Sequence, residues 1–185
     1  MKKSSYELTR RTFVQGMAGL VFASATRAAQ RNGKPSAQSK QWIAACRDSL
    51  LKVTKKPDCW SAMKELGVAG VEVEVDFDLA CPSLSGADKT YSLATASGLQ
   101  AVKDRFAEEG LVITAFLMNN RFEERLDEEL EWTRKVVKAA QELDVKAIRI
   151  DVVPRRTKGE EFLSFAVKAC KQICEIAQGT SVRYG

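Results

Sequence analysis

Histidine is absent from all 185 residues. Without an imidazole the sequence cannot form a Ser-His-Asp triad, a Cys-His pair or a histidine-ligated zinc site. Any acid–base chemistry within these residues would therefore use carboxylates, lysine, tyrosine or cysteine.

Long apolar runs and a regular cysteine pattern are absent as well. No apolar stretch reaches the roughly 18 to 20 residues that span a bilayer, so we expect no stable membrane span. The five cysteines are odd in number and irregularly spaced, which does not suit a disulfide framework. Apolar stripes at helical spacing predict that Cys59, Cys170 and Cys174 fill a core.

The net charge of +5 and the pI of about 9.0 come mostly from the N-terminus. Residues 1–29 hold five Lys or Arg and one acid, which leaves 24 basic and 23 acidic residues in the remainder. Because the remainder is nearly neutral, we expect no nucleic-acid partner.

Residues 1–29 also have the layout of an export signal. Arg10 and Arg11 precede a weakly apolar stretch at 13–25 that ends in Ala-Ser-Ala. The arginine pair followed by Thr-Phe-Val-Gln resembles a twin-arginine (Tat) signal, which implies the Tat translocase as a partner and a periplasmic or otherwise exported location. The alternative is an amphipathic surface helix with an incidental Arg-Arg pair. Residues 30–40 contain no large apolar side chain and are typical of a linker.

From residue 41 the sequence alternates between strand and helix patterns. Apolar or β-branched runs predict strands at 42–46, 71–75, 111–118 and 145–153, and the start of a fifth at 180–185. Helical spacing and capping residues predict helices at 58–66, 95–109, 122–143 and 159–177. Such alternation is typical of a parallel α/β sheet, either an open doubly wound sheet or a (β/α) barrel.

Two features favour the barrel. The first strand leads into Arg47, Asp48 and Ser49, with none of the glycines that a nucleotide-binding open sheet carries there. The second strand places its valines on one face and Glu72, Glu74 and Asp76 on the other. A strand covered by helices on both faces would not carry three acids on one of them, whereas a barrel has a polar lumen near its mouth.

Three segments resemble a known family: 65–72 (ELGVAGVE), 111–120 (LVITAFLMNN) and 147–151 (AIRID). They are similar to the N-terminal half of the sugar phosphate isomerase/epimerase family, the xylose isomerase-like TIM barrels, over residues 41–185. The resemblance implies a metal-dependent enzyme that isomerises or epimerises a small sugar or sugar phosphate by proton transfer. It also implies a divalent metal held by Glu, Asp, His and Glu from strands five to eight, so no metal ligand is expected in this span.

The length predicts a partial barrel. A complete (β/α)₈ barrel needs about 250 residues, and residues 41–185 provide about four βα units plus the start of a fifth strand. We therefore expect a fragment that lacks the metal-binding half and is inactive alone, with catalytic residues beyond Gly185 and unknown from this sequence.

Side chains at the carboxyl ends of the predicted strands are the candidate substrate-binding residues: Glu72, Glu74, Asn119, Arg149 and Asp151. The alternative for Glu72, Glu74 and Arg149 is a buried ion-pair network. Asn119 and Asn120 either bind sugar hydroxyls or shape a turn. The basic loop 155–158 either grips an anion or is solvated, and the acidic run 123–129 is expected on an exposed helix face.

Two other functions remain open. One is a metal-free carbohydrate-binding or scaffold protein on the same barrel. The other is an open α/β redox or binding domain that uses Cys46 and Cys81, which requires those two residues to lie within disulfide reach.

Overall fold

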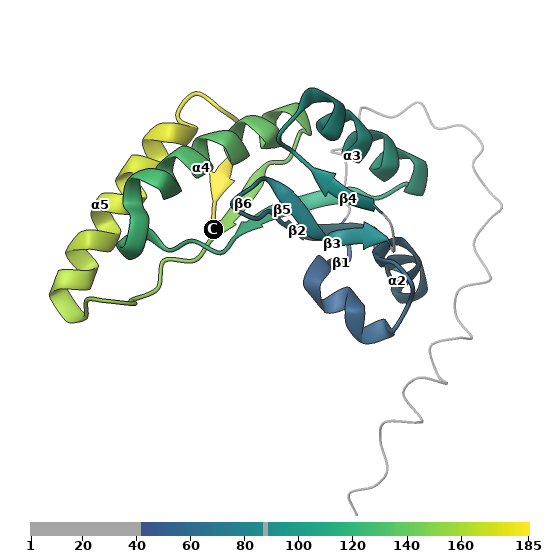
Figure 1. The fold of residues 1–185 in the computed structure, drawn as a ribbon, viewed down its shortest axis with the longest axis horizontal. Helices are drawn as coiled ribbons and strands as arrows, with labels where there is room; N and C mark the ends of the chain where they lie inside the picture. Colours follow the sequence, from purple (N-terminus) through teal and green to yellow (C-terminus); the bar gives the residue numbers. More distant parts are fainter. Residues whose placement is uncertain (1–41, 87–88) are drawn as a thin grey trace, which may run out of the picture. The chain divides into compact units, whose positions relative to one another are not determined.

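The computed structural model describes residues 42–86 and 89–185, and Gln41–Gly185 forms one compact unit (Figure 1). The expected export signal at 1–29 and linker at 30–40 lie outside the described residues. Among the helices that are described, none combines the length and the apolarity needed to cross a membrane.

Five strands form one parallel sheet, and their spatial order follows the chain (Figure 1). They are β1 (Ala45–Arg47), β2 (Gly70–Glu74), β5 (Val112–Met118), β6 (Ala147–Ile150) and β7 (Arg183–Tyr184). An open doubly wound sheet reverses its strand order at a switch point, whereas a barrel adds each strand beside the last. The observed order is that of a partial (β/α)₈ barrel, as the sequence predicts.

The connecting helices are η1 (Asp48–Thr54), α2 (Cys59–Leu66), α3 (Ala96–Glu109), α4 (Phe122–Glu142) and α5 (Gly159–Ala177). Asp58 and Thr95 cap α2 and α3, because each side chain accepts a hydrogen bond from the backbone N–H three residues on. Gly67 and Gly110 end the same helices at φ +65°, a left-handed conformation that glycine adopts without strain. The four predicted α-helices are confirmed within one or two residues.

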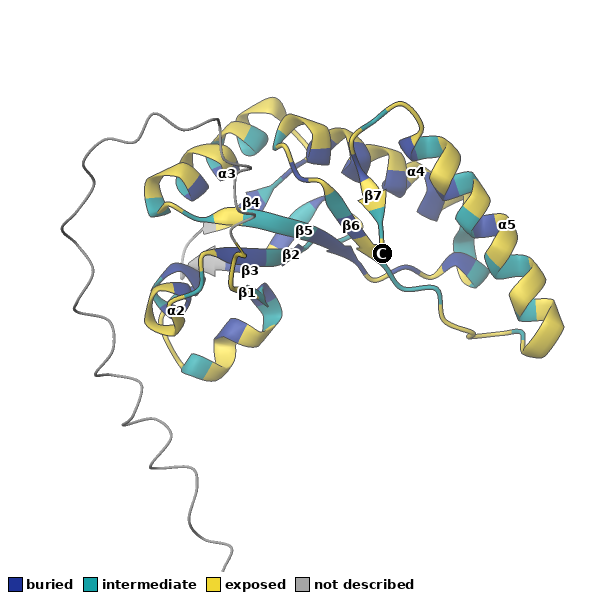
Figure 2. Cartoon of the chain, turned by 180° about the vertical axis from the view of Figure 1, so that it is seen from behind, coloured by how far each residue is buried: buried dark blue, intermediate teal, exposed yellow. Residues whose placement is uncertain are grey.

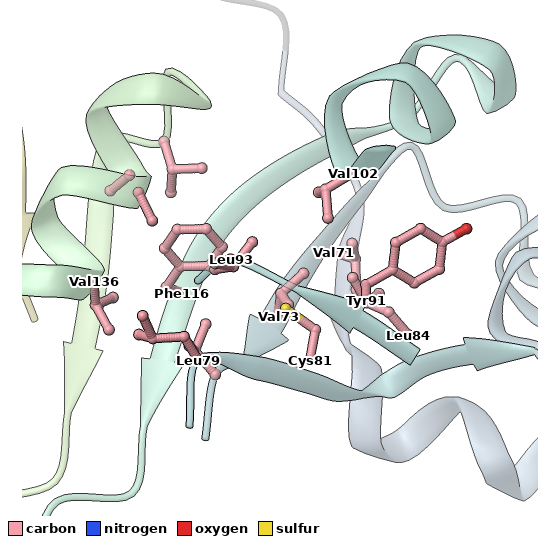
Figure 3. Packing of buried hydrophobic residues seen from close by; sticks show 14 of the residues in the cluster. Val71, Val73, Leu79, Cys81, Leu84, Tyr91, Leu93, Val102, Phe116 and Val136 are labelled. Atoms are coloured by element: carbon pink, nitrogen blue, oxygen red, sulfur yellow. The ribbon is translucent and has the colours of Figure 1, made fainter. Parts of the chain in front are cut away.

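A hairpin between β2 and α3 was not predicted. It consists of β3 (Ala80–Gly86) and β4 (Lys89–Ser92), which pair antiparallel. Figure 3 shows Cys81 of this segment beside Val73 of β2, and Tyr91 beside Val71. The hairpin therefore covers the apolar face of β2 at one end of the sheet.

Burial varies from residue to residue along the strands of the sheet (Figure 2), and the end of β2 alternates between buried and half-buried residues. Val71, Val73 and Val75 are at most 1% exposed, whereas Glu72 and Glu74 are half-buried on the opposite face. Parallel register places Glu74 beside Leu117 of β5, and Leu117 beside Arg149 of β6. The alternation on the second strand is confirmed. Glu72 and Glu74 lie on the face away from the main core, and together with Arg149 they form the polar row of this face.

Several local predictions were wrong. The first strand begins at Ala45 rather than residue 42, so Arg47 lies inside it, and β6 is shorter than the predicted run 145–153. Cys174 is exposed and Cys170 half-buried, because only part of the apolar stripe on α5 contacts α4 and the sheet. Cys59 does fill the core, and its Sγ donates to the carbonyl of Leu84 at 3.1 Å.

A substitution at Phe116 tests the assigned core. It is fully buried on β5, so Phe116→Ala should lower the free energy of unfolding by about 3 to 5 kcal/mol through lost burial and a new cavity. Urea denaturation followed by circular dichroism measures this loss, and Gln100→Ala on the exposed side of α3 should change stability by less than about 0.5 kcal/mol. Equal effects of the two variants would contradict the assigned core.

Candidate functional site

Glu74 is the centre of the polar row at the carboxyl end of β2. Its Oε2 lies 3.3 Å from Nη2 of Arg47, and its Oε1 accepts a hydrogen bond of 2.5 Å from Nδ2 of Asn119. Its side chain is 22% exposed. One carboxylate thus joins the ends of β1, β2 and β5.

Arg149 is the centre of a second group on β6. Its guanidinium lies 3.8 Å from Oε2 of Glu72 and 3.6 Å from Oδ1 of Asp151. Because the Arg149 side chain is 47% exposed, these pairs are solvent-screened, and each contributes little to stability. The guanidinium therefore keeps donors available to a ligand.

All five candidate residues lie at the same edge of the sheet. Glu74 and Asn119 are in direct contact, as are Glu72, Arg149 and Asp151. The ion-pair interpretation and the substrate-binding interpretation both fit this geometry, because each side chain is paired yet partly exposed.

Asp48, directly after β1, binds the backbone at the carboxyl end of β2. Its side chain is 1% exposed and accepts hydrogen bonds from the backbone N–H of Glu74 at 2.8 Å and of Ser49 at 2.6 Å. Burial raises the pKa of Asp48 to about 6, although the two backbone donors act in the opposite direction. From its position directly after the first strand, the sequence predicts that Asp48 lies at the carboxyl end of the sheet. No pattern in the sequence predicts that its side chain is buried.

Asp76 follows β2 and shapes the turn into the hairpin. Its Oδ1 accepts hydrogen bonds from the backbone N–H of Asp78 at 3.0 Å and of Ala80 at 2.7 Å. One oxygen of this carboxylate is thereby engaged in holding the turn.

The two asparagines after β5 have different roles. Asn119 contacts Glu74, whereas Asn120 is buried and donates to Oε2 of Glu129 at 2.8 Å. Oε1 of Glu129 accepts from Nε of Arg125 at 2.7 Å. Glu129 is fully buried, so the expectation that the whole run 123–129 is exposed was wrong.

Glu123 holds the loop that follows β6. Its carboxylate accepts hydrogen bonds from the hydroxyl of Thr157 and from the backbone N–H groups of Arg155, Arg156 and Thr157. These donors, the hydroxyl foremost, lower the pKa of Glu123 to about 2. The side chains of Arg155, Arg156 and Lys158 are exposed, as expected of a solvated basic loop.

The residues present do not fit a divalent metal. Among residues 42–86 and 89–185, no three His, Cys, Asp or Glu side chains converge on a point that an ion could occupy. Both oxygens of Glu74 are engaged with Arg47 and Asn119.

The thiols do not form a redox pair. Cys46 lies in β1 and Cys81 in β3, and both are free. Burial raises the pKa of Cys81 to about 12 and also raises that of Cys46. A reactive thiol needs a lowered pKa, so the environment of these two thiols does not favour the redox interpretation.

Several solved structures with a similar fold are named as sugar isomerases or epimerases. The chain is similar to a sugar phosphate isomerase/epimerase from Parabacteroides distasonis ATCC 8503, with 14% identity and a TM-score of 0.58 over 81% of this chain and 52% of that chain. It is also similar to the IOLI protein with a binding zinc atom (14% identity, TM-score 0.53, 77% of this chain and 50% of that chain). A third is an L-ribulose 3-epimerase, with 11% identity and a TM-score of 0.52 over 78% of this chain and 49% of that chain.

The fold is that of a partial (β/α)₈ TIM barrel. The chain spans about half the length of the barrels it matches. No protein-family model and no curated protein sequence matches it.

Asp48 makes the stability of the barrel edge depend on pH. Because its pKa is raised from 3.8 to about 6, the folded protein retains a proton that the unfolded chain releases. This retained proton contributes to the free energy of unfolding. The contribution is complete below about pH 4 and is lost as pH rises through about 6, and its total is on the order of 1 to 3 kcal/mol.

Urea unfolding of the wild type and of Asp48→Asn between pH 4 and 7 measures this contribution. The free energy of unfolding of the wild type should fall relative to that of Asp48→Asn as pH rises. Asp104→Asn, which removes a charge from the exposed face of α3, is the control and should follow the wild-type profile. A difference between wild type and Asp48→Asn that is constant with pH would contradict the assignment.

Glu123 should control the exchange of the loop amides that it binds. Glu123→Gln removes the charge that receives three backbone N–H groups, so hydrogen exchange at residues 155–157 should accelerate about tenfold or more. Mass spectrometry of deuterium uptake checks this. Glu124→Gln is the matched control, since Glu124 lies 3.5 Å from Arg121 and contacts no loop amide, and it should leave this uptake unchanged.

Proposed function

We propose that this protein is part of a sugar isomerase or epimerase of the xylose isomerase-like class. The observation that carries the proposal is the row of carboxylate, guanidinium and amide groups at the carboxyl ends of β2, β5 and β6. TIM barrels place their active sites at this edge. Structural neighbours named as a sugar phosphate isomerase/epimerase and an L-ribulose 3-epimerase support the same class of substrate.

Within this half, the side chains would bind and orient the sugar. Arg149 has the exposure and the donors to bind hydroxyl or phosphate oxygens. Glu74 and Asn119 form a hydrogen-bonded acceptor–donor pair that suits neighbouring hydroxyl groups. Asp48 holds the backbone of Glu74 and thereby positions that pair.

Isomerisation or epimerisation would need metal ligands that these 185 residues do not contain. A divalent metal, expected from the family resemblance and supported by the neighbour with a bound zinc atom, would take its ligands from outside this span. We therefore expect the 185-residue protein to bind sugar weakly and to be inactive alone.

We also propose that the protein is exported through the Tat translocase to the periplasm or beyond. Support comes from Arg10 and Arg11, the apolar stretch that follows and the Ala-Ser-Ala end. Replacing both arginines by lysine should abolish export of a folded reporter fused after residue 40.

Sugar binding tests the proposed function. Saturation-transfer NMR with ketopentoses, ketohexoses and their phosphates should detect binding to the 185-residue protein at millimolar affinity. Arg149→Gln should weaken this binding by about threefold or more, because a charge-assisted donor is lost. Arg134→Gln, on the exposed face of α4 beside Glu131, is the matched control and should leave binding unchanged.

Two results would overturn the proposal. One is the absence of binding by every sugar and sugar phosphate tested. The other is binding that Arg149→Gln and Arg134→Gln weaken equally, since the effect would then be one of overall charge.

The second candidate is a metal-free carbohydrate-binding or scaffold protein. What favours it is that Glu72, Glu74 and Asp151 are all paired with cations or an amide. Metal content and a sugar epimerisation assay on a protein with all eight strands separate the two candidates, because only the enzyme would need metal and turn over substrate.

A further inference from the structure

A hollow of about 690 Å³ lies between helices α3 and α4. Its volume is within the roughly 300 to 1,000 Å³ of small-molecule sites in proteins. Four leucines from the ends of the hairpin, from α3 and from the end of α4 line it: Leu79, Leu93, Leu99 and Leu143. Three lysines line it as well: Lys103 on α3, and Lys135 and Lys138 on α4. We call this hollow the α3–α4 groove.

The groove lies on the face of the sheet that the helices cover. Leu79 and Leu93 belong to the main core, together with Phe116 of β5 and Val136 of α4 (Figure 3). The polar row lies on the opposite face. Helix α4 packs along α5 but makes few contacts with α3, which leaves the space between α3 and α4 open. The groove is therefore distinct from the proposed sugar site.

The lysines of the groove differ from the other cations of the same two helices. Six Lys and Arg residues lie on α3 and α4. The three arginines are each paired with acids on their own helix: Arg105 with Glu108 and Glu109, Arg125 with Glu129, and Arg134 with Glu131. The other three cations are the lysines that line the groove. Within residues 42–86 and 89–185, none of these lysines forms an ion pair.

The groove is positively charged, although the chain beyond residue 29 is nearly neutral. Among the described residues that line it, Glu142 is the acid, so three lysines and one glutamate leave two positive charges in excess. Residues 30–185 as a whole hold 24 basic and 23 acidic residues. The excess positive charge is therefore local, and it adjoins apolar surface. Unpaired ammonium groups beside leucines suit a ligand that has an anionic head and an apolar body.

We propose that the α3–α4 groove binds a small amphipathic anion, that is, a carboxylate or phosphate attached to an apolar body. The apolar body lies against the leucines, where its burial provides most of the binding free energy. Lys103 and Lys138 hold the anionic head through charge-assisted hydrogen bonds. The pairing of apolar surface with unpaired cations is the observation that selects this class of ligand.

Charge and shape argue against other occupants. Residues 1–29 of this chain hold five Lys or Arg and one acid, so the lysines of the groove would repel that segment. A membrane surface is broad and flat, whereas the groove is a hollow between two helices. A soluble small molecule fits both the volume and the charge.

This proposal goes beyond the proposed function, because the groove and the polar row lie on opposite faces of the sheet. It requires no sugar, metal or catalysis. Failure to bind sugar would leave it standing, and failure to bind an amphipathic anion would leave the sugar site standing.

Titration of the ¹⁵N-labelled 185-residue protein with decanoate tests the proposal by NMR. We expect saturable amide shifts at residues 93–103 and 135–143, with a dissociation constant of about 0.05 to 1 mM. Decyltrimethylammonium has the same alkyl chain with a positive head and should bind at least tenfold more weakly. Acetate has the same head without the chain and should cause no saturable shift.

Variants separate the contributions of charge and of space. Replacing both Lys103 and Lys138 by glutamine should weaken decanoate binding by about tenfold, because two cationic donors are lost. Ala96→Trp should weaken it without a change of charge, since Ala96 lines the groove and is exposed. Lys168→Gln, at an exposed position of α5 outside the groove, is the matched control and should leave binding unchanged. Far-UV circular dichroism verifies that the variants are folded, as these exposed positions allow.

Four results would overturn the proposal. The first is the absence of saturable shifts with decanoate, with or without binding to phosphatidylserine vesicles; vesicle binding alone would assign the lysines to a membrane surface. The second is equal binding of decyltrimethylammonium and decanoate. The third is an equal effect of Lys168→Gln and of the double lysine variant. The fourth is a set of shifts that lies outside the groove.

Discussion

The valines of β2 pack against α3 and the hairpin, and the rest of the structure depends on this contact. Val71, Val73 and Val75 are at most 1% exposed, and strand geometry then places Glu72 and Glu74 on the other face. A one-residue slip in register would bury both glutamates and expose the valines. The same hydrophobic contact that stabilises the sheet thus fixes where its polar row lies.

Carboxylates then connect successive units along the mouth of the partial barrel. Asp48, after β1, binds the backbone of Glu74 at the end of β2, and Glu74 binds Asn119 after β5. Glu123, at the start of α4, binds the loop after β6. Each bond joins two segments that are far apart in sequence, so these side chains help to fix the shape of the mouth.

The side chains of the polar row are held by ion pairs and yet remain partly accessible to solvent. Its ion pairs are 3.3 to 3.8 Å long and only partly exposed, and surface pairs of this kind add little stability. Under the proposed function, a sugar replaces these screened contacts at Arg149 at small cost.

Local patterns in the sequence determined the α-helices, the order of the parallel strands and the face on which the acids lie, because caps, periodicity and alternation act over a few residues. Tertiary structure alone decided the hairpin, since Ala80–Gly86 combines proline, serine and glycine with little strand alternation. It also decided the burial of Glu129, which needs Arg125 and Asn120 as partners. The exposure of Cys174 followed from the tertiary structure too: periodicity marks an apolar side of a helix, but only a neighbouring element can bury it.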